Sequence, residues 1–422
     1  MGMRAVRGMR LLENELYLSD LRRVCGLALP WQELNGKRIL ISGATGMIGS
    51  TLIDVLMMRN RDMDVAGNSA MLRRNSKTGA ADYAALDCGA ADCAATDATP
   101  GCRIIALGRS EEKAKERFRE YWEDPHFTFV KCNINDRENL TRAFGAALGG
   151  KALPADGSDG GAVDYVFHAA SNTHPVAYAN DPIGTVVTNI IGLDNLLHVA
   201  AEHGCSRFLF ASSNEIYGEN RGDTELFDEK YCGYIDCNTM RAGYPESKRA
   251  GEALCQAYIR QKGLDVVIPR FTRSFGPTLL RTDTKALSQF IRKGVAGENI
   301  VLKSAGTQFF SYTYVCDAVS GLLYCLLKGK CGEAYNIADV SCDITLRDLA
   351  KAIADYVGTE VIFDLPDEVE AAGYSKATKA RLDSTKLQGL GWKAQFDMKT
   401  ALAHTIEVMR QVSEKTAQKS LT

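Results

Sequence analysis

Short apolar runs alternate with longer amphipathic segments between residues 37 and 270. Apolar runs of about five residues are typical of buried strands, and apolar residues at every third or fourth position are typical of helices. The predicted strands are 37–42, 103–107, 127–131, 163–167, 207–210 and 264–270. The predicted helices are 50–58, 111–122, a segment before 149, 181–203 and 244–262. Alternating strands and helices form a parallel sheet with helices on both faces, so the pattern predicts a doubly wound α/β fold.

The regular alternation loosens beyond residue 270, where shorter strands and helices predict a smaller α/β domain that supplies a substrate pocket. Two stretches break the pattern because they are rich in Ala, Asp and Gly and have few large apolar residues, which predicts inserted loops. The predicted division is an N-terminal extension (1–33), a dinucleotide-binding domain (34–270, with insertions near 60–101 and 149–161), a mainly substrate-binding domain (271–410, with a segment near 310–327 returning to the first domain) and a tail (411–422).

A glycine-rich loop joins the first predicted strand to the first predicted helix. The loop reads Gly43-Ala-Thr-Gly-Met-Ile-Gly49. Glycines permit a tight turn and close approach to a pyrophosphate, and the helix N-terminus offers free N–H groups to it. The context of strand, loop and helix predicts a Rossmann-type dinucleotide site. The predicted cofactor-binding residues here are Gly43, Thr45, Gly46, Met47, Ile48 and Gly49.

Polar and small residues follow the next strands at the edge where ligands bind in such folds. Arg109 ends the second strand, where an acidic residue favours NAD and an arginine can face the 2′-phosphate of NADP, so both cofactors stay open at this point. Asn133 and Ile134 are expected near an adenine ring. The fourth strand ends in His168-Ala169-Ala170, a predicted cofactor contact, followed by Ser171 and Asn172 as predicted substrate contacts.

Tyr244 and Lys248 are the candidate catalytic pair. Four residues apart, they lie one turn apart on the same face of a helix. A phenol has a pKa of about 10, and a nearby ammonium favours the phenolate. Lowering that pKa to about 7 requires roughly 4 kcal/mol, at about 1.36 kcal/mol per unit. Ser213, after the fifth strand, is expected to orient a substrate hydroxyl whose proton Tyr244 removes.

The amino-acid composition limits the kinds of partner and the compartment, but it says little about the reaction. The 422 residues are 45% hydrophobic, which is ordinary for a soluble protein. Their net charge of −2 gives no positive electrostatic field that would attract nucleic acid or an anionic membrane. No apolar run reaches the roughly 18 residues of a membrane span. Glu13, Glu15 and Asp20 interrupt the basic N-terminus, which does not read as a secretory signal, so we expect the cytoplasm. The 13 cysteines lack zinc-ligand spacing and are expected to be scattered thiols, with no metal.

The ordered set of motifs resembles the extended short-chain dehydrogenase/reductases, specifically the NAD-dependent epimerase/dehydratase group acting on nucleotide sugars. The resemblance covers residues 34–407 apart from the two insertions. It rests on Gly43 to Gly49, His168 to Ser171, Asp181-Pro182 with Asn189, Ser213 before Tyr217-Gly218, Tyr244 with Lys248, Arg270 before Phe275-Gly-Pro277, Tyr335-Asn-Ile-Ala and Leu390-Gly-Trp392. It implies that Tyr244 is the base, that Lys248 holds the nicotinamide ribose and that the reaction passes through a 4-keto sugar.

Glu215 helps to choose among the reactions that follow a 4-keto sugar. The pair Asn214-Glu215 resembles the Ser-Glu of UDP-glucuronate decarboxylases more than the Asp-Glu of dehydratases, and the residues before Tyr244 also resemble the decarboxylase pattern. A carboxylate there can act as a base or steer a decarboxylation. The favoured function is a UDP-glucuronate decarboxylase. The alternatives are a UDP-sugar 4-epimerase, a dTDP- or GDP-sugar 4,6-dehydratase and a non-catalytic dinucleotide sensor.

Two departures from the family pattern concern the substrate. Arg273 replaces an asparagine that usually touches substrate, and Phe310 stands at the position of a diphosphate-binding arginine. Arg273 or Arg281 can supply the missing cation, because a guanidinium suits bidentate phosphate contact. Asn214 is a further predicted substrate contact. The resemblance also implies a homodimer formed by the helices at 182–203 and 244–262.

Overall fold

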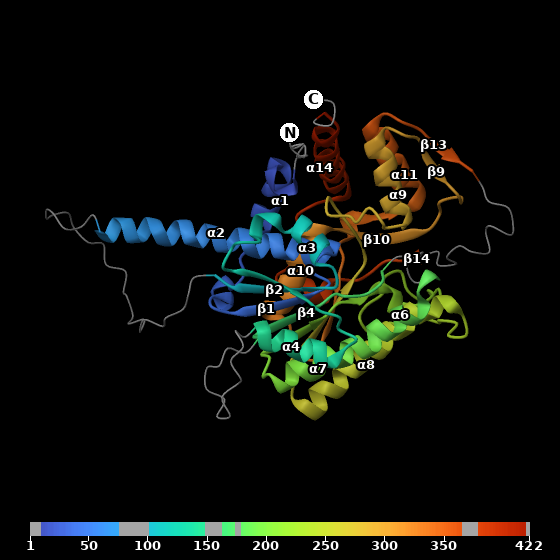
Figure 1. Cartoon of the computed structure of the whole chain (residues 1–422). Coiled ribbons are helices and arrows are strands. Elements are labelled where there is room, and N and C mark those ends of the chain that lie inside the picture. The colour runs from blue at the N-terminus through green and yellow to red at the C-terminus, as the bar shows by residue number, and fades with distance from the viewer. Residues whose placement is uncertain (1–9, 76–100, 148–162, 174–178, 365–378, 419–422) are drawn as a thin grey trace, which may run out of the picture.

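The computed structural model describes residues 10–75, 101–147, 163–173, 179–364 and 379–418 (Figure 1). A parallel sheet of eight strands runs through its centre. The strands are β1 (Arg38–Ser42), β2 (Arg103–Gly108), β3 (Phe127–Lys131), β4 (Tyr165–His168), β5 (Arg207–Phe210), β6 (Ser212–Ser213), β7 (Val266–Phe271) and β11 (Ala334–Ile337). The inner strands are nearly continuous apolar runs because helices cover them on both faces, whereas β3 at the edge is partly exposed.

The strand order is β11-β7-β5-β4-β1-β2-β3, with β6 also paired to β7. All of these pairings are parallel. The order reverses between β1 and β4, which lie side by side in the register Ser42 to His168. Ligands bind at the carboxyl ends of strands beside such a reversal. The predicted doubly wound α/β fold is confirmed.

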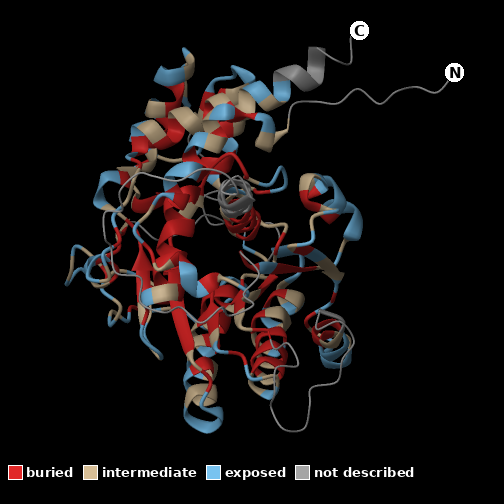
Figure 2. Cartoon of the chain, turned by 90° about the vertical axis from the view of Figure 1, so that its left-hand side faces the viewer, coloured by how far each residue is buried: buried red, intermediate tan, exposed pale blue. Residues whose placement is uncertain are grey.

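Helices cover both faces of the sheet (Figure 1). On one face lie α1 (Glu15–Cys25), α2 (Met47–Asn75), α3 (Glu111–Arg117) and α10 (Val315–Lys328). On the other lie α4 (Arg137–Ala147), α6 (Pro182–Val187), α7 (Leu193–Glu202) and α8 (Gly243–Lys262). The buried residues gather on the sheet and on the helix faces turned towards it, while the outer helix faces are exposed (Figure 2). One hydrophobic core therefore lies on each side of the sheet.

The second region of the fold stands beside the carboxyl ends of the large sheet. It contains a four-stranded sheet and a two-stranded sheet. Its elements are β8 (Arg273–Phe275), α9 (Ala286–Ala296), β9 (Ile300–Leu302), β10 (Phe309–Tyr314), β12 (Asp343–Thr345), α11 (Leu346–Val357), β13 (Val361–Phe363), β14 (Lys379–Ala380), α13 (Thr385–Gln388) and α14 (Met398–Gln418). α10 packs against α2 and β7, and β11 pairs with β7, so these two elements belong to the large sheet. The division into domains at residue 270 stays a prediction.

The loop prediction for residues 60–101 is wrong in its first part. α2 continues from the glycine loop to Asn75, because 60–75 contains several good helix formers and no proline. The sequence pattern did not predict this continuation, because a helix that extends beyond the core needs no apolar stripe. Residues 76–100 and the predicted insertion at 149–161 lie outside the described residues.

Two predicted helices are interrupted. The helix predicted at 111–122 ends at Arg117, and a short 3₁₀ turn at Arg119–Tyr121 follows it. The helix predicted at 181–203 contains a π-helical turn at Thr188–Gly192 between α6 and α7. Hydrophobic periodicity does not reveal either change, because both keep the chain on nearly the same helical path.

Candidate active site

The glycine loop is shaped by the backbone of the neighbouring strand. Gly43 has φ +72°, and a Cβ atom there would lie 2.7 Å from the backbone of Ala169 and Ala170. Any side chain at this position would therefore separate β1 from β4 at their carboxyl ends. Gly46 to Gly49 then begin α2 and line a cavity, so the first N–H groups of the helix face open space. This arrangement fits the pyrophosphate of a dinucleotide.

One cavity of about 1090 Å³ runs from the glycine loop to the second region of the fold. It collects most of the predicted site residues from separate parts of the chain. Those that line it are Gly43, Thr45, Gly46, Met47, Ile48, Gly49, Arg109, Asn133, Ile134, Ala169, Ala170, Ser171, Asn172, Ser213, Asn214, Glu215, Tyr244, Lys248 and Arg273.

Beyond the glycine loop, residues after β2 and β3 line the cofactor end of the cavity. Arg109 follows β2 and is exposed, so its guanidinium is available to solvent and to a ligand. Asn133 and Ile134 follow β3, where the Asn133 backbone N–H is bonded to the Asn139 side chain at 3.0 Å. Ile134 is buried and offers an apolar wall. These positions suit an adenosine that leaves the glycine loop across the ends of β2 and β3.

His168 does not line the cavity, contrary to its prediction as a cofactor contact. Its ring is fully buried, lies 6.0 Å from the Phe210 ring and pairs through Nδ1 with the Ser42 hydroxyl at 2.7 Å. Burial lowers the pKa of His168 to about 3, so the ring is neutral. The His168 ring lies against Phe210, whose ring the Lys248 ammonium also contacts, so His168 is packed on the α8 side of the sheet and not in the cavity. Its role is to join β4 to β1.

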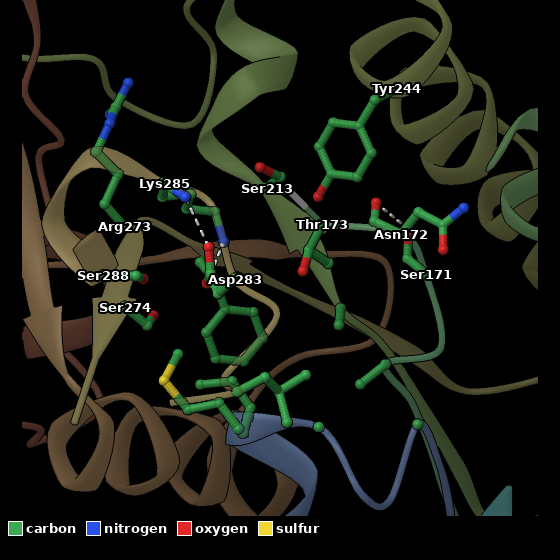
Figure 3. A pocket seen from close by; sticks show the side chains of 18 of the residues that line it. Ser171, Asn172, Thr173, Ser213, Tyr244, Arg273, Ser274, Asp283, Lys285 and Ser288 are labelled. Atoms are coloured by element: carbon green, nitrogen blue, oxygen red, sulfur yellow. Dashed lines mark hydrogen bonds and ion pairs between the residues drawn. The ribbon is translucent and has the colours of Figure 1, made fainter. Parts of the chain in front are cut away.

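Tyr244 and Lys248 lie in the first turns of α8 with the predicted spacing. Tyr244 is nearly buried but lines the cavity, and its hydroxyl points into the same space as the Ser213 hydroxyl (Figure 3). The Lys248 ammonium donates to the Ala211 carbonyl at 2.8 Å and lies 4.7 Å from the Phe210 ring centroid. Burial lowers the pKa of Lys248 to about 8, because the charged form loses its hydration.

Ser213 ends β6 and begins a 3₁₀ turn, Asn214–Tyr217. Its hydroxyl accepts the backbone N–H of Glu215 at 3.2 Å, so the serine caps the turn that carries the glutamate. Asn214 is buried, and the Glu215 side chain is half-buried at the cavity wall. The turn therefore presents a hydroxyl, an amide and a carboxylate to the same space.

Ser171 and Asn172 form the wall that faces Tyr244 (Figure 3). The Asn172 amide donates to the Thr185 hydroxyl at 2.9 Å, and this bond ties the wall to α6. Thr173 follows and also lines the cavity, although motif analysis did not single it out. No sequence signal marked Thr173, because its position depends on the chain leaving β4 towards α6.

The two departures from the family pattern meet in space. β8 pairs with β10, and the Arg273 guanidinium carbon lies 3.6 Å from the centroid of the Phe310 ring. A guanidinium stacked on an aromatic face is held in one orientation. Arg273 and Phe310 both line the cavity. Arg281 is exposed and does not line the cavity, because the turn after Leu280 directs it outward, so the structure does not bring it to the site.

Several charged lining residues were missed by the sequence analysis. Asp283 is nearly buried, accepts the Lys285 backbone N–H at 2.9 Å and lies 3.4 Å from the Lys285 ammonium (Figure 3). Lys285 immediately precedes α9, while Arg241 reaches the cavity from a 3₁₀ turn at Met240–Ala242 and Lys303 from the loop after β9. Loops without a motif give no sequence signal for such placement. Among the described residues, no group of three His, Cys, Asp or Glu is arranged to hold a metal ion.

Comparison with known proteins agrees with this geometry. The sequence model of the NAD dependent epimerase/dehydratase family matches residues 39–338. The chain therefore belongs to this family of enzymes, and NAD is the cofactor of the class.

Curated relatives narrow the resemblance within the family. The chain is 32% identical over 384 residues to UDP-glucuronic acid decarboxylase 1 of Xenopus tropicalis, covering 90% of this chain and 74% of the relative. It is 25% identical to UDP-glucuronic acid decarboxylase 3 of Arabidopsis thaliana, covering 86% of each chain. Among solved structures, the UDP-glucose 4-epimerase of Thermotoga maritima has a TM-score of 0.67 at 22% identity, covering 89% of this chain and 99% of the other. That similarity concerns the fold.

Proposed function

We propose that the chain is an NAD-dependent UDP-glucuronate decarboxylase that acts through a 4-keto sugar. The observation that carries the proposal is one cavity that Tyr244, Ser213 and Glu215 line together with a glycine loop suited to a dinucleotide. The similarity to UDP-glucuronic acid decarboxylases over most of the chain supports the choice of sugar.

The first step oxidises the C4 alcohol of the sugar to a ketone, with loss of a hydride from C4 and of a proton from the C4 hydroxyl. When bound, NAD would supply the hydride acceptor for C4 and the hydride donor for the final reduction. The Ser213 hydroxyl orients the C4 hydroxyl, and the Tyr244 phenolate takes its proton. Lys248, fixed on the Ala211 carbonyl, favours the phenolate through its charge. The residues that would hold the cofactor are the glycine loop, Arg109, Asn133 and Ile134.

The second step is the loss of the sugar carboxylate. A ketone at C4 makes the C6 carboxylate a β-keto acid, so the bond between C5 and C6 breaks, CO₂ leaves and its electron pair enters the C4 carbonyl. A proton then returns to C5 before C4 is reduced. Glu215 lies on the turn beside Ser213, where its charge can orient the carboxylate group or its conjugate acid can deliver that proton.

The substrate diphosphate is assigned to the cationic side of the cavity. Arg273, held on Phe310, offers the planar donor edge that bidentate phosphate contact requires. Lys285 adds a second cation at the start of α9, where the helix dipole also favours an anion. This wall lies apart from Tyr244, as a substrate that spans the cavity requires (Figure 3).

The decisive experiment incubates the purified protein with UDP-, dTDP-, GDP- and CDP-sugars. We expect CO₂ and a UDP-pentose from UDP-glucuronate, with absorbance of the reduced cofactor only during turnover. Formation of UDP-galactose from UDP-glucose would replace the decarboxylase by a 4-epimerase. A 4-keto-6-deoxy product would indicate a 4,6-dehydratase, and tight dinucleotide binding without any turnover would indicate a sensor.

Arg109 keeps the choice between NAD and NADP testable. NAD is the cofactor of the family, and the Arg109 side chain is exposed at the end of β2. We expect tighter binding of NAD than of NADP, measured by calorimetry, and a smaller residual affinity for NADP in Arg109→Gln. Tighter NADP binding in the unchanged protein would assign the 2′-phosphate to Arg109.

We also propose a homodimer through the outer face of α6, the π turn and α8. Ile183, Val186 and Ile191 are exposed there, and α6 packs beside α8 (Figure 1). Ile183→Glu combined with Ile191→Glu should convert a dimer into a monomer in light scattering. Ile362→Glu, on the exposed strand β13, is the control and should leave the dimer intact. A monomeric unchanged protein would refute the dimer.

The cytoplasm is the proposed compartment, because all the described cysteines are free. Among the described residues, the helical stretch Pro182–Glu202 alone has the length and hydropathy to cross a membrane, and half of its most apolar window is buried. Fractionation of cells that express the protein tests this assignment, and recovery with membranes would contradict it.

A further inference from the structure

Two hydrogen bonds connect α8 to the strand ends that carry Ser213. The Lys248 ammonium donates to the Ala211 carbonyl at 2.8 Å, and the Ser212 hydroxyl donates to the Glu252 carboxylate at 2.5 Å. Lys248 and Glu252 are four residues apart and therefore lie on one face of α8. Two consecutive residues before Ser213 are thus tied to two consecutive turns of the helix that carries Tyr244.

The bond from Ser212 ends on a carboxylate that is itself held rigidly. Arg270, on β7, contacts both oxygens of Glu252 at 2.9 and 2.6 Å. The Arg270 and Glu252 side chains are largely buried, so their charges depend on each other for compensation. Bidentate contact between guanidinium and carboxylate also fixes the angle of the carboxylate. Glu252 therefore offers Ser212 an acceptor with a defined position.

Arg270 is anchored by further groups behind the site. Its guanidinium donates to the Tyr217 hydroxyl at 2.9 Å and to the Glu229 carbonyl at 2.7 Å. Tyr217 ends the turn that begins after Ser213. The same ion pair thus contacts both ends of this turn, through Ser212 on one side and Tyr217 on the other.

We propose that Ser212 and the Glu252–Arg270 pair are positioning residues that set the Ser213 hydroxyl against the Tyr244 hydroxyl. Backbone pairing of Ser212 with Arg270 fixes the register of β6 against β7. The hydrogen bond from the Ser212 hydroxyl to Glu252 fixes β6 against α8. None of these three residues is assigned a contact with the reacting sugar. This inference rests on the proposed function for its kinetic part only.

Ser212→Ala removes the connection to α8 and leaves the ion pair in place. The matched control is Ser320→Ala. Ser320 is another buried serine, on α10, and its hydroxyl accepts from the Trp392 ring N–H and donates to the Asp317 carbonyl. Both variants lose buried hydrogen bonds and should lose comparable stability. Ser212→Thr keeps a hydroxyl in a strand position and tests for rescue.

In Ser212→Ala we expect kcat for UDP-glucuronate to fall about tenfold, with KM and NAD affinity within twofold of the unchanged protein. Hydrogen exchange of the peptide over residues 213–217, measured by mass spectrometry, should accelerate about tenfold. Ser212→Thr should recover most of both values, and Ser320→Ala should change neither. An unchanged kcat in Ser212→Ala, or an equal fall in Ser320→Ala, would overturn the positioning role.

The exchange measurement separates this inference from the proposed reaction. If the unchanged protein releases no CO₂ from UDP-glucuronate, the reaction is wrong, and exchange of residues 213–217 still decides whether Ser212 holds the turn. Slow exchange in Ser212→Ala would then refute the inference by itself. Fast exchange in Ser212→Ala but not in Ser320→Ala would support it.

Discussion

The two ends of the cavity are built in different ways. At the glycine loop of the cofactor end, residues adjacent in sequence are adjacent in space, because the loop joins one strand directly to one helix. At the substrate end, Arg273, Asp283, Lys285 and Lys303 come from a short strand and separate loops. The cofactor end depends on backbone shape, whereas the substrate end depends on which side chains the loops present. Substitutions should therefore separate the two ends.

The largest effect is expected where the two ends meet. Tyr244→Phe removes the hydroxyl that takes the substrate proton, and we expect kcat to fall about a thousandfold, within the range for general base catalysis. NAD affinity should remain within about twofold. Tyr258→Phe is the control on the same helix, because its hydroxyl bonds to Asp194 away from the cavity. Activity close to that of the unchanged protein in Tyr244→Phe would reject the proposed base.

A backbone substitution should damage the cofactor end alone. In Gly43→Ala the new Cβ meets the backbone of Ala169 and Ala170, and the positive φ adds strain. We expect NAD affinity to fall about a hundredfold in calorimetry. Gly358→Ala has a similar φ of +77° but open space around the Cβ, so it should cost stability without changing NAD affinity. Equal NAD affinity in the two variants would contradict the role of the glycine loop.

The stability of the fold should respond to pH through a buried carboxyl group outside the cavity. Asp317 on α10 accepts the backbone N–H groups of Gln395 and Phe396 at 2.8 and 3.1 Å. Burial raises the pKa of Asp317 to about 7, above its ordinary value of 3.8. A raised folded-state pKa gives stability that is present below pH 3.8 and is lost as the pH rises through 7.

Urea unfolding of the unchanged protein and of Asp317→Asn measures this effect. The stability of the variant relative to the unchanged protein should increase by about 2 kcal/mol between pH 5 and pH 7, at up to about 1.36 kcal/mol per unit. A difference that is constant over this range would show that Asp317 titrates normally.

The smallest effect is expected at the substrate end, because more than one cationic side chain there is proposed to bind the diphosphate. Arg273→Gln removes a charged donor, and we expect the affinity for UDP to fall about tenfold with NAD affinity unchanged. Arg281→Gln is the matched control, because Arg281 is exposed outside the cavity. If Arg281→Gln lost affinity for UDP and Arg273→Gln did not, the diphosphate would have to be assigned to Arg281 in place of Arg273.

Sequence patterns predicted the cofactor end residue by residue because its chemistry depends on local features. Strand, glycine loop and helix specify a backbone shape, and Tyr244 with Lys248 needs only the period of a helix. His168 was predicted to contact the cofactor from its place at a strand end, whereas its ring is buried between Ser42 and Phe210, which only the packing around β4 decides. The continuation of α2 to Asn75 was missed because a helix beyond the core lacks an apolar stripe.

The sequence by itself determined the doubly wound fold and the family and predicted the residues proposed to act at the sugar carbon, since each follows from short-range periodicity or from a contiguous motif. Only the tertiary structure decided that Arg273 lies on Phe310, that Asp283 and Lys285 enter the cavity and that Ser212 is tied to Glu252. These placements depend on the pairing of distant strands and on loop paths, which involve contacts between residues up to 40 positions apart in the case of Ser212 and Glu252. No local pattern specifies such contacts, because they form only when the complete core has packed.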